Sequence, residues 1–145
     1  MTDSTEPTIT DVTFRTIVID PSVAVNSLLD TTRKGDRASR AIEDCCLMAP
    51  TVFPYEVTNV IRRQLSARLL SPEAAELAWI GLTDLDVDLW QWATIAERVW
   101  RLKGSLSTYD ASYIALAEVL DCPLVTTDAK LAAMAPPTCR IELIT

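Results

Sequence analysis

The sequence predicts an α/β fold, a three-layer α/β/α sandwich built around a mainly parallel sheet. Short β-branched or apolar runs alternate with amphipathic helical segments along almost the whole chain, and right-handed β-α-β crossovers are the usual way to connect parallel strands. The chain has 145 residues and 49% apolar content, which suits one domain with a sizeable core. The sequence contains no internal repeat and no Gly/Ser linker. We therefore expect one domain over residues 16–145.

The first half of the chain is expected to begin with a tail and to continue with alternating strands and helices. Residues 1–15 are polar, rich in Ser and Thr, and carry three acids against one base, which favours a flexible tail. Beyond the tail, β-branched runs indicate strands, and apolar residues three and four positions apart indicate helices. The expected elements are a strand at 16–20, helices at 21–30 and about 36–46, a strand at 47–52 and a helix at 54–70.

The second half shows the same alternation, with clearer helix ends. Ser71 followed by Pro72 is typical of a helix start, and Gly104 of a helix end. The expected elements are helices at 71–81 and 91–103 with a short strand at 86–90 between them, a helix at 107–121, a strand at 123–127, a helical turn at 128–134 and a last strand at 140–144.

Composition excludes several classes of chemistry. There is no histidine, which rules out Ser-His-Asp and Cys-His nucleophile pairs and His-ligated zinc. Only three glycines occur, so neither a P-loop nor a dinucleotide-binding G-x-G-x-x-G motif can be assembled. The four cysteines form no C-x-x-C pair and no secretory leader is recognisable, so a reduced, cytoplasmic protein is expected. The adjacent Cys45 and Cys46 are expected to be buried thiols, with a redox role as the alternative.

The distribution of charge and aromatic residues bears on possible partners. Apolar runs reach at most five residues, far short of the roughly 20 of a membrane span. The net charge of −7 opposes nucleic-acid binding unless local clusters of bases provide it. Three clusters either contact phosphates or form solvated helix faces: Arg33, Lys34, Arg37 and Arg40; Arg62, Arg63 and Arg68; and Arg98, Arg101 and Lys103. The spacing of the tryptophans favours core or partner contacts over base stacking: Trp79, Trp90, Trp92 and Trp100.

Four carboxylates fall where a predicted β-element passes into a helix. Asp20 ends the first strand, and Glu56 lies in the first turn of the helix expected at 54–70. Asp110 opens the helix expected at 107–121, and Asp128 directly follows the run PLVTT. In an open parallel sheet the carboxyl ends of the strands share one edge, where ligands usually bind, so the four acids are expected to converge there. Helix capping explains single acids equally well, and both interpretations stay open.

Converging carboxylates require a positive partner, because each raises the pKa of its neighbours. Without histidine or a cysteine pair the ligand set is all oxygen, which selects a hard ion such as Mg²⁺ or Mn²⁺ over zinc. Such an ion neutralises a phosphate oxygen and delivers a water to phosphorus. The chemistry indicated is phosphodiester hydrolysis.

Several motifs resemble those of the PIN domain family, most closely its VapC-type toxins from type II toxin–antitoxin pairs. The most specific pieces are Y-D-A-x-Y-x-A-L-A at 109–117 and L-V-T-x-D at 124–128, with a weaker E-V-x-N at 56–59. The resemblance implies a PIN-like ribonuclease domain that cleaves single-stranded RNA with Mg²⁺ or Mn²⁺, forms a homodimer and is blocked by a cognate antitoxin. The implied catalytic and metal-binding residues are Asp20, Glu56, Asp110 and Asp128.

The same resemblance implies supporting roles for Ser22, Asn59 and Thr126. Asn59 lies three residues after Glu56, on the same helical face, where its amide is placed to orient the carboxylate or a water. Two other functions remain open. A non-catalytic α/β binding module would keep the fold without binding a divalent ion. An aspartyl-phosphate receiver also gathers acids at strand ends, but the last strand, RIELI, lacks the lysine it needs.

Overall fold

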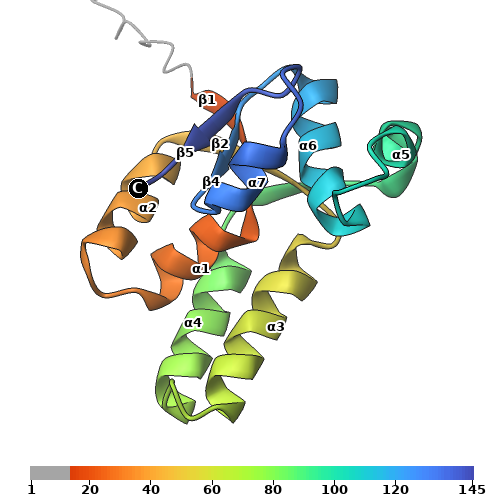
Figure 1. The fold of residues 1–145 in the computed structure, drawn as a ribbon. Helices are drawn as coiled ribbons and strands as arrows, with labels where there is room; N and C mark the ends of the chain where they lie inside the picture. The colour runs from red at the N-terminus through yellow and green to blue at the C-terminus, as the bar shows by residue number, and fades with distance from the viewer. Residues whose placement is uncertain (1–13) are drawn as a thin grey trace, which may run out of the picture.

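The computed structural model describes residues 14–145, in which seven helices surround a five-stranded sheet (Figure 1). The strands are β1 (Arg15–Ile19), β2 (Cys45–Pro50), β3 (Val87–Trp90), β4 (Leu124–Thr126) and β5 (Ile141–Leu143). The helices are α1 (Pro21–Leu29), α2 (Arg33–Ile42), α3 (Phe53–Ser66), α4 (Pro72–Asp84), α5 (Trp92–Arg101), α6 (Thr108–Leu120) and α7 (Ala129–Met134). None of the described helices has the length and apolarity needed to cross a bilayer.

The strand order is β3-β2-β1-β4-β5, and every pair is parallel. From β1 the chain moves outward through β2 to β3, then crosses to β4 and moves outward again to β5. The order therefore reverses between β1 and β4, which is where open parallel sheets usually bind ligands. The N–H of Asp20 donates to the carbonyl of Val125 over 3.0 Å, so the pairing of the two strands continues into the first residue after β1.

Helices cover both faces of the sheet, which confirms the predicted three-layer sandwich. Right-handed crossovers put α1 to α4, which connect β1, β2 and β3, on one face and α5 to α7 on the other. Helix α6 lies against β1, β2 and β4, and its residues from Ala111 to Ala117 are all buried. Helices α3 and α4 pack side by side as a hairpin that extends beyond the carboxyl ends of the strands (Figure 1).

The largest difference from the predicted elements is at the second helix and the strand after it. Helix α2 begins earlier than expected because Thr32 caps it, accepting the N–H of Lys34, and the chain turns at Asp44 with φ of 56°. Strand β2 then begins at Cys45, which pairs with Arg15 of β1. The prediction that Cys45 and Cys46 are buried was wrong, because Cys45 is partly buried and Cys46 is exposed at the amino end of the sheet.

The predicted tail, residues 1–15, falls almost entirely outside the described residues, and its last residue, Arg15, is the first residue of β1. Of the four tryptophans, for which core or partner contacts were expected, three are exposed. Trp90 packs against the core. The others are 45%, 55% and 68% exposed, for Trp79, Trp92 and Trp100 respectively.

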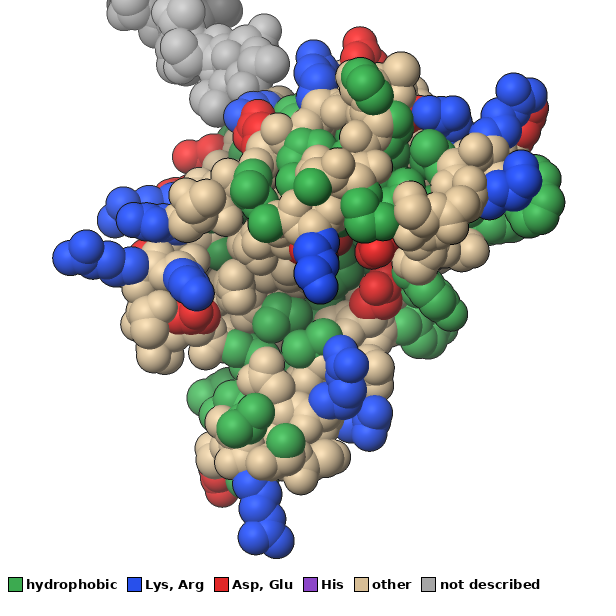
Figure 2. All heavy atoms as spheres, in the orientation of Figure 1, with side chains coloured by type: hydrophobic (Ala, Val, Ile, Leu, Met, Phe, Trp, Pro, Cys, Tyr) green, Lys and Arg blue, Asp and Glu red, His purple; other side chains and the backbone are tan. Residues whose placement is uncertain are grey.

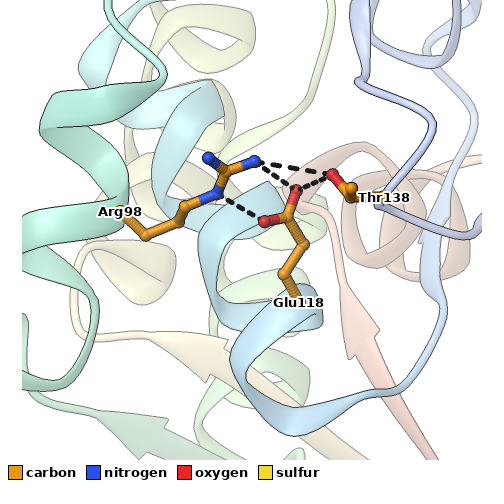
Figure 3. A network of polar contacts seen from close by, with 3 residues as sticks. All are labelled: Arg98, Glu118 and Thr138. Carbon is orange, nitrogen blue, oxygen red and sulfur yellow. Dashed lines mark hydrogen bonds and ion pairs between the residues drawn. The ribbon is translucent and has the colours of Figure 1, made fainter.

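Helix α5 is fastened to α6 by a polar network (Figure 3). The Arg98 guanidinium donates from both Nε and Nη2 to the two oxygens of Glu118, and the Thr138 hydroxyl donates to Glu118 Oε1 over 2.9 Å. The Glu118 side chain is only 13% exposed. Arg98 therefore has a structural partner within the fold, although the sequence analysis expected its cluster of bases either to contact phosphates or to form a solvated helix face.

Candidate active site

The four predicted acids all lie at the carboxyl edge of the sheet. Asp20 directly follows β1, Glu56 is in the first turn of α3, Asp110 is in the first turn of α6, and Asp128 caps α7 two residues after β4. Figure 2 shows acidic side chains gathered between α7 and the α3–α4 hairpin, with basic side chains beside them and on the hairpin. The acids therefore frame the point at which the strand order reverses.

Asp20 is the most enclosed of the four, with an exposed fraction of 6%. Its Oδ2 accepts hydrogen bonds from the backbone N–H of Ser22 over 3.1 Å, from the Ser22 hydroxyl, and from Thr126 Oγ1 over 3.1 Å. Within the described residues no hydrogen bond reaches Oδ1. Burial raises the pKa of Asp20, and the nearby charge of Asp110 raises it further, while the bonds from Ser22 and Thr126 oppose the change.

Ser22 and Thr126 lie where supporting residues were expected. Besides holding Asp20, the Ser22 hydroxyl accepts the N–H of Thr127 over 3.0 Å, and Thr126 Oγ1 accepts the N–H of Asp128 over 3.0 Å. The two hydroxyls thus join the loop after β1 to the loop after β4. Because Asp20 and Asp128 belong to these two loops, the network fixes the positions of their carboxylates relative to each other.

Glu56 has a partner that the sequence analysis missed. The phenol of Tyr113, a side chain only 1% exposed, donates to Glu56 Oε1 over 2.9 Å. Burial raises the pKa of Glu56, the charges of Asp20 and Asp110 add to this, and the hydrogen bond from Tyr113 opposes it. The available signal was spacing, because Tyr113 lies three residues after Asp110, on the same face of α6.

Asp110 and Asp128 combine site geometry with the start of a helix. Burial raises the pKa of Asp110, and the charge of Asp128 adds to it. Ser107 caps α6 by accepting the N–H of Asp110 over 3.1 Å. Asp128 is exposed and caps α7 through Oδ1, which accepts the N–H groups of Lys130 and Leu131 over 2.9 and 3.2 Å. Asp128 therefore caps α7, as one of the two interpretations predicted, and also lies at the site, where its second oxygen takes no part in the cap.

Asn59 does not make the contact expected of it. Its Oδ1 accepts two hydrogen bonds from Arg62, over 3.1 Å from Nε and 2.9 Å from Nη2, and no hydrogen bond between Asn59 and Glu56 is present in the described part of the chain. The two residues share a face of α3, but the contact found uses the amide oxygen as acceptor, whereas a contact with the Glu56 carboxylate requires the amide NH₂ group as donor.

The acids face one another without forming a closed cage. The charge of Asp110 raises the pKa of Asp20, and the charges of Asp20 and Asp110 raise the pKa of Glu56. Across residues 14–145, however, no group of three or more His, Cys, Asp or Glu side chains is close enough to hold an ion outright. A hydrated Mg²⁺ or Mn²⁺ uses one or two carboxylates and keeps several waters. The all-oxygen donor set, with Oδ1 of Asp20 free, fits an ion of this kind.

Residues 17–136 match the PIN domain family. The Mycobacterium tuberculosis (strain CDC 1551 / Oshkosh) protein Ribonuclease VapC12 is 32% identical over 128 residues, covering 88% of this chain and 98% of its own length. Ribonuclease VapC9 of the same strain has the same identity and coverage.

Solved structures give the same assignment of the fold. The sarcin-ricin loop cleaving toxin VapC20 of Mycobacterium tuberculosis superposes with a TM-score of 0.61 at 17% identity, over 86% of this chain and 98% of that one. VapBC2 from Rickettsia felis, bound to a DNA fragment from its promoter, superposes with a TM-score of 0.64 at 11% identity, over 88% of this chain and 98% of that one. At these identities the likeness concerns the fold alone.

Proposed function

The chain belongs to the PIN domain family, and from this premise we propose that it is a Mg²⁺- or Mn²⁺-dependent endoribonuclease, the toxin of a type II toxin–antitoxin pair. The observation that carries the proposal is the set of four carboxylates at the point where the strand order reverses, in a chain whose relatives are named ribonucleases. The family assignment also removes the receiver-domain interpretation.

In this proposal Asp20, Asp110 and Asp128 hold the divalent ion directly or through water. The free Oδ1 of Asp20 and the second oxygen of Asp128 are the atoms available to it. When bound, the ion supplies positive charge to a phosphate oxygen and lowers the pKa of a water. Ser22 and Thr126 keep the Asp20 carboxylate in one orientation, so that binding requires little rearrangement.

Glu56 is proposed to accept a proton from the attacking water. Its raised pKa makes the carboxylate a stronger base than a fully solvated glutamate, which favours proton transfer. The hydrogen bond from Tyr113 occupies Oε1 and leaves Oε2 to face the water. Two exposed bases on α3, Arg62 and Arg63, are available to the phosphates of a bound strand.

The partners are part of the same proposal. The acidic edge attracts a basic inhibitory segment, which supports a cognate antitoxin as the neutralising partner. The names of the relatives and the VapBC2 structure support this pairing. A homodimer and a cytoplasmic location are proposed on the same family grounds.

The experiment that tests the function is cleavage of a single-stranded RNA by the purified full-length chain with Mg²⁺ or Mn²⁺, and with EDTA. Asp110→Asn should lower the rate at least about 100-fold while circular dichroism stays unchanged. Asp121→Asn is the matched control, because Asp121 is an exposed left-handed helix cap far along α6, where Asn is well tolerated. Undiminished cleavage by Asp110→Asn rejects the site. A wild-type chain that neither cleaves RNA nor binds Mn²⁺ is instead the non-catalytic binding module.

A further inference from the structure

A small apolar pocket lies beside the acids at the carboxyl ends of β2 and β3. Its volume is about 140 Å³, and its lining includes Thr51, Trp90, Trp92, Ile95, Tyr109 and Ser112. None of the residues that line it is charged. Pockets for drug-sized ligands start at about 300 Å³, so this one suits a single ring system.

The aromatic side chains that line the pocket differ in how far they are buried. Trp90 ends β3, packs against the core and donates its indole N–H to Met48 Sδ over 3.3 Å, so it forms a fixed wall. Ile95, 2% exposed, closes the inner end. Trp92 and Tyr109 are 55% and 60% exposed, although both rings line the pocket. Large aromatic surface is therefore presented to solvent at the mouth.

The pocket offers stacking surface and little polar recognition. The hydroxyl of Ser112, which lines it, already donates to the carbonyl of Tyr109 over 2.6 Å. The indole N–H of Trp90 is likewise occupied. A flat, uncharged ring system with a large π-face matches these walls, because stacking needs no matching hydrogen-bond groups.

The pocket adjoins the candidate active site through two of its lining residues, Thr51 and Tyr109. Tyr109 immediately precedes Asp110 in the first turn of α6, and adjacent Cα atoms are only about 3.8 Å apart. Thr51 follows β2 and precedes α3, the helix that carries Glu56 in its first turn. A strand with one phosphate at the acids therefore has its neighbouring base within reach of Trp92 and Tyr109.

We propose that this pocket receives one unpaired nucleobase of the RNA strand, stacked on Trp92 and Tyr109, next to the phosphate that is cleaved. The inference rests on the proposed ribonuclease function and adds how the strand is held. A base inside a duplex is stacked on its neighbours and cannot enter, so the pocket selects single-stranded positions. Selection comes from the size and stacking of the base rather than from hydrogen bonds.

The test compares Trp92→Ala and Tyr109→Ala with Trp100→Ala, which removes a tryptophan that is also more than half exposed but does not line the pocket. Each pocket variant should raise the KM for a short single-stranded RNA about 5- to 100-fold with little change in kcat, and Trp92→Phe should recover most of the loss. Trp100→Ala should behave like the unaltered chain. Thermal melts check folding, which is expected to persist because both rings are more than half exposed.

A second measurement leaves the protein unaltered and changes the RNA. Abasic nucleotides are placed one at a time around the cleaved bond, and one position should reproduce the loss seen with Trp92→Ala. At that position the variant and the abasic change should not add, because both remove the same contact.

The inference is overturned, with the ribonuclease function intact, if the unaltered chain cleaves RNA and both alanine variants match it in KM. The same result is expected if the pocket instead receives an apolar side chain of a protein partner. Full additivity of Trp92→Ala with every abasic position also overturns it. A wild-type chain that neither cleaves nor binds RNA rejects the function and the inference together.

Discussion

Asp20→Asn is expected to stabilise the ion-free protein while abolishing its ability to gain stability from Mn²⁺. Burial raises the pKa of Asp20 in the folded state, so its ionised form opposes folding at neutral pH. In the variant, the amide oxygen of the asparagine can take the place of Oδ2 and accept the same hydrogen bonds from Ser22 and Thr126. The NH₂ group then takes the place of Oδ1, which has no hydrogen-bond partner among the described residues. The substitution thus removes the charge and keeps the hydrogen-bond geometry.

The magnitude follows from the size of such effects. Removing a buried charge of this kind adds on the order of 1 kcal/mol to the free energy of unfolding, and for a chain of this length that raises Tm by about 2–4 °C. The gain should be present at neutral pH and vanish as pH falls below the pKa of the unfolded state, near 3.8, because there the carboxyl is protonated in both states. With Mn²⁺ at about 100 times its Kd, the unaltered chain should gain about 2.7 kcal/mol and the variant almost nothing.

The assay is a set of thermal melts in EDTA and in Mn²⁺, from pH 3.5 to pH 8, with Asp121→Asn as the control that changes neither series. The expected outcome is a reversal, in which the variant is the more stable protein in EDTA and the less stable in Mn²⁺. A lower Tm for Asp20→Asn in EDTA at neutral pH would refute the electrostatic reasoning. An equal gain from Mn²⁺ in both proteins would show that Asp20 takes no part in binding the ion.

Three further substitutions test separate parts of the structure. Tyr113→Phe removes the 2.9 Å hydrogen bond to Glu56, which should raise the pKa of that carboxyl further and move the acid limb of the kcat–pH profile to higher pH. At pH values on that limb kcat should fall about 10-fold, because less of the carboxyl is ionised, and an unmoved profile would separate Tyr113 from the proton transfer. Thr126→Val keeps the shape of the side chain but deletes the hydrogen bond from its hydroxyl to Asp20. Titration calorimetry should find the affinity for Mn²⁺ about 10- to 100-fold weaker, and an unchanged affinity would mean that Thr126 contributes packing alone. Arg98→Ala should lower the free energy of unfolding by about 1 kcal/mol in urea titrations, with the cleavage rate of the folded protein unchanged.

The positions of the acids were predictable from the sequence because each follows a recognisable strand or helix start. Asp20 comes after a β-branched run and Asp128 after PLVTT, and the ends of parallel strands necessarily share an edge. The polar support from Ser22 and Thr126 was expected from the resemblance to the PIN domain family rather than from the spacing of these residues.

Other features depend on how distant segments meet, which periodicity does not encode. The bond between Tyr113 and Glu56 requires α6 to pass beside the first turn of α3, and the two residues are 57 positions apart. The strand at Cys45 was read as the end of a helix because a short apolar run suits either element. Spacing put Asn59 on the same face as both Glu56 and Arg62, but it does not decide how the amide is oriented, and here its oxygen accepts from Arg62.

Asp128 uses Oδ1 to cap the first turn of α7 and keeps its second oxygen out of the cap, and resonance couples the charges of the two oxygens. Drawing charge toward the outer oxygen weakens the acceptor at the inner one, which loosens the N–H groups of Lys130 and Leu131. Under the proposed function, faster amide hydrogen exchange at these two residues would therefore report that the divalent ion is bound, and it can be measured without any substrate.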